Sequence, residues 1–413
     1  MLPGLIPVRQ AFSASSISNV AAAMERALAA LALDQRVRPG MRIGIPAGSR
    51  GISQIPLLLR VVVDHVRRLG GEPVLVTAMG SHGGGTAAGQ LSVLESLGIT
   101  ETAVGGPVVG NVEATVVATA AGGEPVYFDR VLAGCDGLVV INRVKPHTSF
   151  HGPLESGLTK MLVVGCGKPP GALQFHNLGA ALLAERLRQF GKILLERLPV
   201  LGGVAVLENG REEIADLVPV HPDSWVETEE QLLERARALL PRLPVNHLDL
   251  LVIDEMGKNI SGTGMDTNVI GRMGIRGVPE DRGPEVGRIV VLDLTESSHG
   301  NANGMGLADF VTRRLADKVD FKATYLNTLT ATFVERAKLP IVMESDREAM
   351  ETALRTLGSP PEPRIIRIKN TLELERIWVS PAVLRELDGL PSVTVEGGPE
   401  DWPFDATGNL PLK

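Results

Sequence analysis

The chain has 413 residues, of which 44% are hydrophobic and 22% charged, a composition typical of globular proteins rather than disordered ones. Its length favours two or three domains. The 41 Lys and Arg residues against 48 Asp and Glu residues give a formal net charge of −7, and the charges are interspersed along the chain. A dedicated nucleic-acid binder would carry a basic stripe, so we exclude that class.

The sequence also favours a location in the cytoplasm. No apolar run reaches about 18 residues, so we expect no membrane span, and the first residues lack the pattern of a secretory signal. Cys135 and Cys166 cannot build a disulfide framework, which predicts a cytoplasmic location. Aromatic residues make up only 3% of the chain, which holds 46 glycines. We therefore expect ligands to be bound mainly by backbone groups and a few polar side chains.

Strands and helices are predicted to alternate near the start of the chain. Residues 15–34 have the spacing of a capped amphipathic helix. Apolar strands are predicted over 42–46 and 73–78, and helices over 54–69 and 86–97. Strand, turn and helix in this order indicate βαβ units on a parallel sheet. Ligands of such sheets bind beyond the carboxyl ends of the strands.

The rest of the chain continues the α/β pattern. We predict strands over 137–143, 161–167, 202–210, 248–257, 288–294 and 365–371, and helices over 171–190, 228–240, 305–318 and 346–357. A Pro-flanked stretch at 241–246 is the best linker candidate. The expected fold class is therefore α/β, with two α/β domains and a cofactor and substrate cleft between them. The expected bounds are 1–244 and 247–384, with a tail of about 385–413 that can pack back on the first domain.

Several histidines fall in the predicted turns of the first domain. His82, His147, His151 and His176 lie in glycine-rich turns or shortly after a predicted strand. One loop histidine alone is usually an ordinary polar side chain, but several at one sheet edge indicate a site.

Two segments carry residue types suited to catalysis. Glycines flank His82, and the helix that follows favours an anion such as phosphate at its N-terminus. The second segment is 145–160, in which the imidazole of His147 or His151 could move a proton at neutral pH. Lys160 precedes an apolar run and could be a nucleophile or a covalent anchor. His176 has no His or Cys at zinc-ligand spacing, so a metal there would need most of its other ligands from a cofactor.

Taken together, these motifs resemble those of one known family. The motifs are Ser49-Arg50-Gly51, Gly80-Ser81-His82, and Lys145-Pro146-His147 followed by Lys160 and His176. Their order and spacing are similar to those of the lactate racemase family that depends on a nickel-pincer nucleotide. The resemblance covers most of the chain and is strongest over 42–180.

The resemblance implies an isomerase, a racemase or epimerase that inverts C2 of a 2-hydroxy acid by proton-coupled hydride transfer. Its cofactor would be nickel held in pyridinium-3,5-bisthiocarboxylate mononucleotide, bound by the first domain, while the second domain grips the substrate. By matching, Lys160 is the covalent tether and His176 the nickel ligand. Ser49, Arg50 and Ser81 would contact the cofactor.

The resemblance also implies the acid and base. His82 and His147 would take these roles, and His151 remains a rival to His147 because the loop before Lys160 is longer here. Arg50 could bind the substrate carboxylate as well as the cofactor. The expected partners are a small 2-hydroxy acid and the proteins that make the cofactor, and the oligomeric state stays open.

Some positions depart from the family pattern. Ala47 and Gly51 replace its Asp and Pro, and Gly271-Arg272-Met273-Gly274 replaces the Gln and Lys that grip lactate. Arg272, with Lys258 or Arg276 as alternatives, would then take the carboxylate. The substrate is therefore expected to be a 2-hydroxy acid other than lactate, such as a sugar acid or a dicarboxylic hydroxy acid. The alternatives are a hydroxy-acid oxidoreductase and a non-catalytic binding protein on the same fold.

Overall fold

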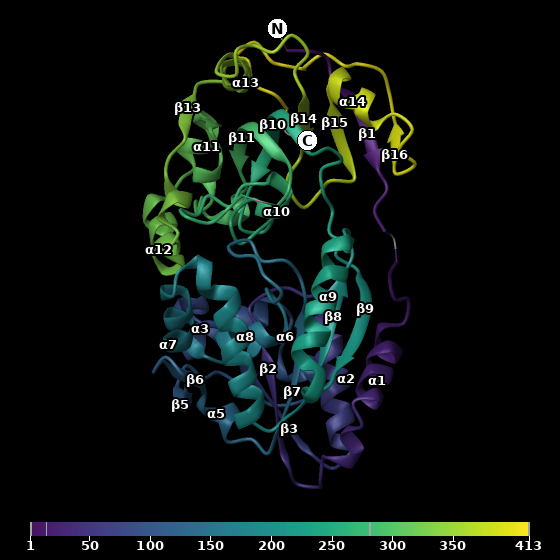
Figure 1. Ribbon diagram of the computed structural model, residues 1–413, viewed down its shortest axis with the longest axis vertical. Coiled ribbons are helices and arrows are strands. Elements are labelled where there is room, and N and C mark those ends of the chain that lie inside the picture. Colours follow the sequence, from purple (N-terminus) through teal and green to yellow (C-terminus); the bar gives the residue numbers. More distant parts are fainter. Residues whose placement is uncertain (1, 14, 281, 412–413) are drawn as a thin grey trace. The chain divides into compact units, whose positions relative to one another are not determined.

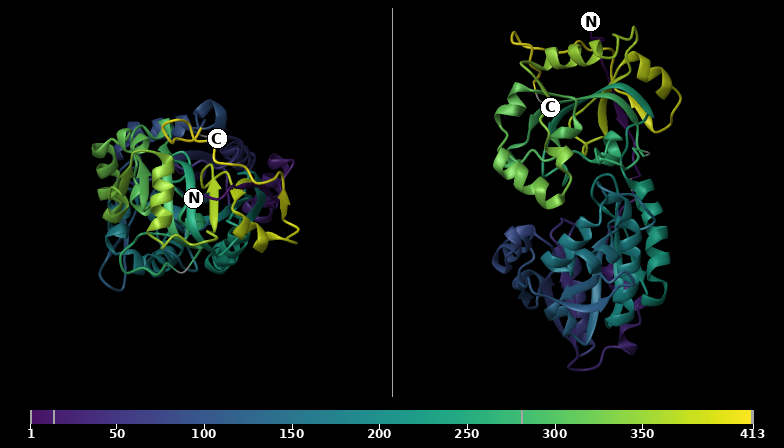
Figure 2. Two further views of the ribbon diagram at one scale, coloured as in Figure 1. Left: turned by 90° about the horizontal axis from the view of Figure 1, so that it is seen from above. Right: turned by 60° about the vertical axis from the view of Figure 1, so that its left-hand side comes forward.

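A computed structural model describes residues 2–13, 15–280 and 282–411 of the chain (Figure 1). The chain divides into two compact units, Ala14–Leu240 and the combination of Met1–Ser13 with Pro241–Lys413. Figure 2 shows the units from two further sides. Both mix helices with sheets, which confirms the α/β fold class.

The 14–240 unit is built on a six-stranded sheet with the order β4-β3-β2-β7-β8-β9. Its strands are β2 (Arg42–Ala47), β3 (Glu72–Thr77), β4 (Val108–Val109), β7 (Gly137–Arg143), β8 (Val200–Glu208) and β9 (Ile214–Val220). Only β9 runs antiparallel to its neighbour. A separate two-stranded sheet pairs β5 (Ala114–Thr119) with β6 (Pro125–Asp129).

Both faces of this sheet are covered, which explains the unbroken apolar strands. In β7, Leu138 and Val140 belong to one core, whereas Val139 and Ile141 belong to the other. Successive side chains of a strand point to opposite faces, so a strand covered on both sides is apolar at every position. The helices are α1 (Val20–Ala30), α2 (Ile55–Arg68), α3 (Ala87–Ser96), α4 (Glu101–Val104), α5 (Arg130–Ala133), α6 (Leu158–Lys160), α7 (Lys168–Asn177), α8 (Ala180–Arg197) and α9 (Trp225–Leu239).

The strand order reverses between β2 and β7. From β2 the chain proceeds through β3 to β4 on one side, whereas β7 and β8 lie on the other. The carboxyl ends of β2, β3 and β7 therefore lie beside one another at one edge, where α/β proteins bind ligands. We call this the switch edge, and its turns are residues 48–54, 78–86 and 144–157.

The strand predicted at 161–167 is wrong. The chain continues from α6 into a π-helical turn at Met161–Gly165, and α7 follows. Met161, Leu162 and Val163 are buried in the core, and a short apolar run looks the same in sequence whether it is buried as a strand or as a helix. The helix predicted at 305–318 is also only partly correct, because β12 (Phe310–Thr312) precedes α11 (Arg313–Asp317).

The second unit contains an eight-stranded sheet with the order β13-β12-β11-β10-β14-β15-β1-β16. The strands not yet given are β10 (His247–Met256), β11 (Glu285–Leu294), β13 (Ile341–Met343), β14 (Ile365–Ile368), β15 (Arg376–Val379), β1 (Ile6–Gln10) and β16 (Val393–Val395). Strands β10 to β14 are parallel, and β15, β1 and β16 are antiparallel to their neighbours. Its other helices are α10 (Thr267–Ile270), α12 (Phe321–Ala331), α13 (Asp346–Arg355) and α14 (Pro381–Leu387).

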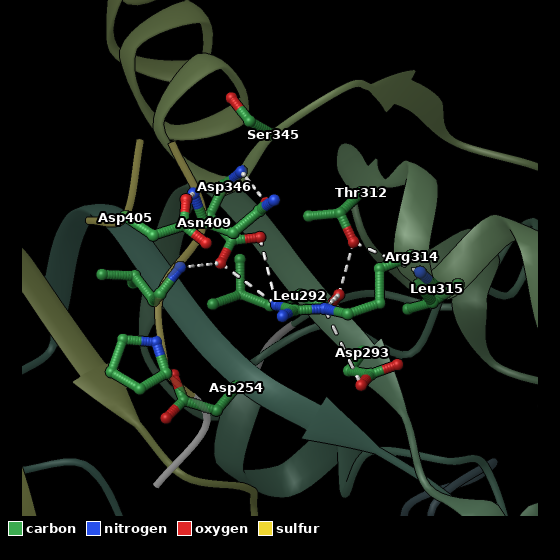
Figure 3. A network of polar contacts seen from close by, with 12 residues as sticks. Asp254, Leu292, Asp293, Thr312, Arg314, Leu315, Ser345, Asp346, Asp405 and Asn409 are labelled. Atoms are coloured by element: carbon green, nitrogen blue, oxygen red, sulfur yellow. Dashed lines mark hydrogen bonds and ion pairs between the residues drawn. The ribbon is translucent and has the colours of Figure 1, made fainter. Parts of the chain in front are cut away.

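Both ends of the chain lie in this second unit. Strand β1 pairs with β15 and β16, as Figure 1 shows, so the first residues do not join the 14–240 unit. Near the C-terminus, the Leu410 N–H donates to Asp346 at 2.7 Å. The Asp346 N–H donates to Asn409 at 3.3 Å (Figure 3). Arg314 pairs with the same Asp346 carboxylate at 3.1 Å. The expectation that 385–413 packs on the first domain is therefore corrected, because these long-range contacts hold the tail in the second unit.

Among the described residues, no helix has both the length and the apolar character needed to cross a membrane.

The role of β1 can be tested by shortening one buried side chain. Ile6 is 4% exposed, and Ile6→Ala should lower the free energy of unfolding of the second unit by about 2–5 kcal/mol because it leaves a cavity. Urea denaturation followed by circular dichroism measures this loss. Val395→Ala is the control, since Val395 in neighbouring β16 is 52% exposed. Equal effects of the two substitutions would contradict the assignment.

Candidate functional site

The switch edge joins Ser49 and His82 directly. Ser49 lies in the turn after β2, and its Oγ is 2.5 Å from Nδ1 of His82 in the turn after β3. Ser81, at the start of the same turn, is exposed. The structure therefore brings together two residues that are 33 positions apart in the sequence.

The turn that carries His82 depends on glycine. Gly83, Gly84 and Gly85 have φ angles of 63°, 68° and 67°, a left-handed conformation that strains residues with a Cβ. A Cβ at Gly83 would also lie 2.3 Å from the carbonyl carbon of Gly89. The turn therefore packs closely on the first turn of α3, where Thr86 accepts a hydrogen bond from the Gly89 N–H at 3.1 Å.

A buried carboxylate organises the loop that follows β7. Glu155 accepts hydrogen bonds from the backbone N–H of His147 at 2.6 Å and of Gly152 at 3.0 Å, and from Arg237 at 2.6 Å. Its Oε1 lies 3.6 Å from Nδ1 of His151. Burial raises the pKa of Glu155, but the nearby His151, the hydrogen bonds from the two backbone N–H groups and the charge of Arg237 outweigh it and lower the pKa overall. Glu155 is therefore an anionic anchor for both candidate histidines.

Lys160 has an unusual electrostatic environment. Burial, together with the positive charges of Arg50 and Lys145, lowers the pKa of Lys160 to about 7, and Glu155 opposes this shift. A large fraction of its amine is therefore neutral at neutral pH, the form that acts as a nucleophile.

A second buried carboxylate holds the backbone beside Lys160. Glu229 accepts hydrogen bonds from the Thr159 N–H at 3.0 Å and the Thr159 hydroxyl at 2.5 Å. Burial raises the pKa of Glu229 to about 7, although the hydrogen bonds from Thr159 and Leu158 oppose it. The α6 turn that ends at Lys160 is thereby tied to α9.

His176, near the end of α7, is suited to binding a metal ion. Burial and the charge of Lys160 lower the pKa of His176 to about 4, so its imidazole is neutral at physiological pH. Its Nδ1 is buried with no hydrogen-bond partner. Neutral imidazole is a good ligand for nickel, so this unpaired nitrogen fits the predicted role. Within the described ranges, no group of three or more His, Cys, Asp or Glu residues could hold a metal ion. The supply of further donors by a cofactor stays a prediction.

An aromatic run connects His147 with His176. The His147 ring stacks on Phe150 with centroids 4.4 Å apart, Phe150 meets Phe175 edge-on at 6.2 Å, and Phe175 meets His176 at 5.9 Å. The loop after β7 and the helix that carries His176 thus pack through their aromatic side chains. His147 and His176 stand at the two ends of this run.

Positive charge gathers at the same edge. Arg50 and Lys145 act electrostatically on Lys160, and Arg143 acts on Arg50. Arg143 forms an ion pair with Glu208, whose other oxygen accepts from the Ser53 N–H at 2.6 Å. This cluster suits an anion such as a phosphate or a carboxylate.

In the second unit, Arg272 has a structural role that the sequence did not indicate. Its guanidinium donates to the Leu307 carbonyl and to Asp309, both at 2.9 Å, and to the Val286 carbonyl at 3.1 Å. These bonds use the guanidinium to hold the loop after α10 against β11 and the segment before β12, and its expected role in binding the substrate carboxylate stays a prediction. Lys258 lies after β10 and donates to the Gly262 carbonyl at 2.6 Å, and Arg276 is exposed.

Sequence reasoning missed several buried polar residues beside the site. Each is at most 2% exposed and forms a hydrogen bond or an ion pair with a residue distant in the sequence. They are Glu229, Lys168, Gln90 and Asp129. Lys168 follows Gly167 and precedes two prolines, a local sequence typical of a turn. No local sequence pattern indicates that such polar residues are buried, because their hydrogen-bond and ion-pair partners are known only from the fold.

Comparison with known proteins identifies the fold. No protein-family model matches the chain, and no curated protein sequence matches it. Among solved structures, the chain is similar to the lactate racemase apoprotein from Thermoanaerobacterium thermosaccharolyticum, with a TM-score of 0.57 and 12% sequence identity. The match covers 89% of this chain and 98% of that one. The likeness therefore extends over both units, and at this identity it concerns the fold.

The reactivity of Lys160 provides a direct test of its environment. Acetylation with acetic anhydride, followed by peptide mass spectrometry, should give a half-maximal rate for Lys160 near its pKa of about 7. An ordinary lysine has a pKa of about 10.4, and exposed Lys192 is the internal comparison. Arg50→Met should move the midpoint to higher pH, because it removes a neighbouring positive charge. Identical pH profiles for Lys160 and Lys192 would disprove the proposed environment.

Proposed function

We propose that the protein is a racemase or epimerase that inverts C2 of a 2-hydroxy acid, with a nickel-pincer nucleotide as cofactor. One observation carries the proposal. The switch edge holds the Ser49–His82 pair, and the helices α6 and α7 that follow its last turn carry a lysine whose pKa is about 7 and a neutral histidine with a buried unpaired nitrogen. The order of the sequence motifs and the fold likeness to a lactate racemase apoprotein support it.

The residues that would hold the cofactor all lie in the 14–240 unit. The amine of Lys160 would form the covalent tether and His176 would bind nickel, while Arg50, Ser49 and Ser81 would contact the nucleotide. When bound, this group supplies an acceptor for the hydride of C2. The cation cluster around Arg50 and Lys145 suits the nucleotide phosphate.

His82 would exchange the hydroxyl proton on one side of the substrate. Its Nδ1 is engaged by Ser49, so transfer to a substrate would use Nε2. When Ser49 accepts the hydrogen bond, Nδ1 carries the proton and the Nε2 lone pair is the base. Ser49 would thereby orient the ring as well as contact the cofactor.

His147 would complete the pair from the opposite side. Its Nδ1 accepts a hydrogen bond from the Ser149 N–H at 3.0 Å, so a neutral His147 carries its proton on Nε2 and can donate it. His151 remains the rival, since it also faces the Glu155 carboxylate. Inversion needs one group that accepts a proton and another that donates one, and each group exchanges its role in the reverse direction.

The substrate carboxylate would be bound by Arg50, whose planar guanidinium matches a carboxylate. In the second unit, Arg272 remains the candidate, with Lys258 or exposed Arg276 as alternatives. Because the residues expected to grip lactate are replaced, the proposed substrate is a larger or more polar 2-hydroxy acid. Such a protein would depend on cofactor biosynthesis proteins. The reduced, buried Cys135 and Cys166 suit the cytoplasm.

The role of His82 is tested by His82→Ala in cofactor-loaded protein. We expect the racemisation rate to fall by about 100- to 10,000-fold, the usual contribution of a general base, while nickel remains bound. Chiral chromatography measures the rate and elemental analysis measures the nickel. His221→Ala is the control because His221 is exposed in the same unit. Unchanged turnover in His82→Ala would disprove this role.

The tether is tested separately by intact-mass measurement. Wild-type protein produced together with the cofactor biosynthesis proteins should carry an added mass that Lys160→Ala lacks, and Lys192→Ala should retain it. An adduct of equal mass in Lys160→Ala would exclude Lys160 as the site of attachment.

The substrate class is tested with a panel of single-enantiomer 2-hydroxy acids and aldonic acids. Cofactor-loaded protein should convert at least one of them to its C2 epimer, and polarimetry or chiral chromatography detects the product. Oxidation to the ketone without epimer formation would instead indicate an oxidoreductase. Binding without turnover of any of them would indicate a binding protein.

A further inference from the structure

Lys168, the first residue of α7, is fully buried beneath the His82 turn. Its side chain is 0% exposed, and its backbone has a φ of 58°, a strained conformation for a residue with a Cβ. The ammonium donates to the Thr77 carbonyl at 2.5 Å, at the carboxyl end of β3. It also lies 3.3 Å from Gln90 Oε1 and 3.3 Å from the Asp129 carboxylate.

Gln90 extends this contact to the backbone that leads into the His82 turn. Its side-chain amide donates to the Met79 carbonyl at 2.9 Å and to the Gly80 carbonyl at 3.0 Å. Gly80 also meets α7 directly, because a Cβ there would lie 2.6 Å from the Cβ of Ala172. Hydrogen bonds through Gln90 therefore link Lys168 of α7 to Met79 and Gly80, the residues just before Ser81. Close packing on Ala172 links Gly80 to α7 a second time.

Asp129 supplies the counter-charge for the buried ammonium. It is fully buried, accepts from Asn111 and from the Leu132 N–H at 2.9 Å each, and ends β6. Burying two charges is expensive, and a well-packed apolar pair of similar volume is often equally stable. Stability alone therefore does not explain an ion pair at this place.

We propose that Lys168, Asp129 and Gln90 are positioning residues that fix the His82 turn relative to α7. This inference rests on the proposed function, in which His82 moves a proton and His176, on α7, binds the metal. The turn itself consists of left-handed glycines, which lose more conformational freedom on folding than other residues. A rigid support below the turn fixes the distance between His82 and His176 that the reaction requires.

The test removes the charges as a pair, so that no buried charge is left alone. In Lys168→Met/Asp129→Asn, the amide oxygen introduced at position 129 can still accept from the Leu132 N–H, but the bonds to Thr77 and Gln90 are lost. Gln90→Met is a milder variant that leaves the ion pair in place and removes the bonds to Met79 and Gly80. The control is Arg367→Met/Asp254→Asn, which removes a similarly buried ion pair, with bonds of 2.7 and 2.9 Å, from the second unit.

Hydrogen–deuterium exchange of the protein without cofactor gives a readout independent of activity. Amide exchange in residues 79–86 should become about tenfold faster in the double variant and in Gln90→Met, because the local opening free energy falls. The control pair should leave this segment unchanged. Unaltered exchange of 79–86 in both test variants would overturn the proposal.

Kinetics of the cofactor-loaded variants give the second readout. A displacement of His82 by about 1 Å should lower kcat by about 100-fold, while KM and the thermal midpoint stay close to the wild-type values. A rise in KM with unchanged kcat would overturn the positioning role. If wild-type protein racemises no 2-hydroxy acid, the proposed function fails, whereas the exchange experiment still decides whether the network supports the turn.

Discussion

The reversal of strand order between β2 and β7 is the constraint on which the candidate site depends. It places the turns after β2, β3 and β7 at one edge of a sheet whose two faces are both covered by apolar cores. Side chains at the strand ends can then meet although they are far apart in the sequence, as the Ser49–His82 contact shows. Glycine makes the close approach of these turns possible, and Gly83 is the clearest example.

Buried charge gives this edge its chemistry. Lys160 has a lowered pKa because burial and neighbouring cations disfavour its ammonium form, and that charge in turn helps to keep His176 neutral. Buried carboxyl groups lie just behind these groups, with Glu155 under the loop of His147 and Glu229 under the turn of Lys160. The site thus combines a neutral nucleophile and a neutral imidazole with buried carboxyl groups that hold the backbone at His147 and at Thr159, next to Lys160. Such opposed shifts are typical of functional sites.

The sequence predicted local features well and long-range features poorly. Strands β2, β3 and β7 were recognisable because apolar runs ended in glycine or polar turns, and these turns contain the candidate residues. The sequence predicts a strand at the π-helical turn after Lys160, because its apolar residues are consecutive and show neither the helical nor the strand spacing of hydrophobic positions. The place of β1, the loop contacts of Arg272 and the burial of Lys168 depend on partners 14 to 387 positions away. No local pattern encodes such pairs.

The central claim is that C2 is inverted by hydride transfer, with His82 moving only the hydroxyl proton. The most direct test is to incubate cofactor-loaded protein with one enantiomer of an accepted 2-hydroxy acid deuterated at C2, and to analyse the opposite enantiomer by mass spectrometry. Transfer of hydride predicts that the product keeps its deuterium at C2. A product with solvent hydrogen at C2 would show abstraction of the C2 proton and would contradict the account.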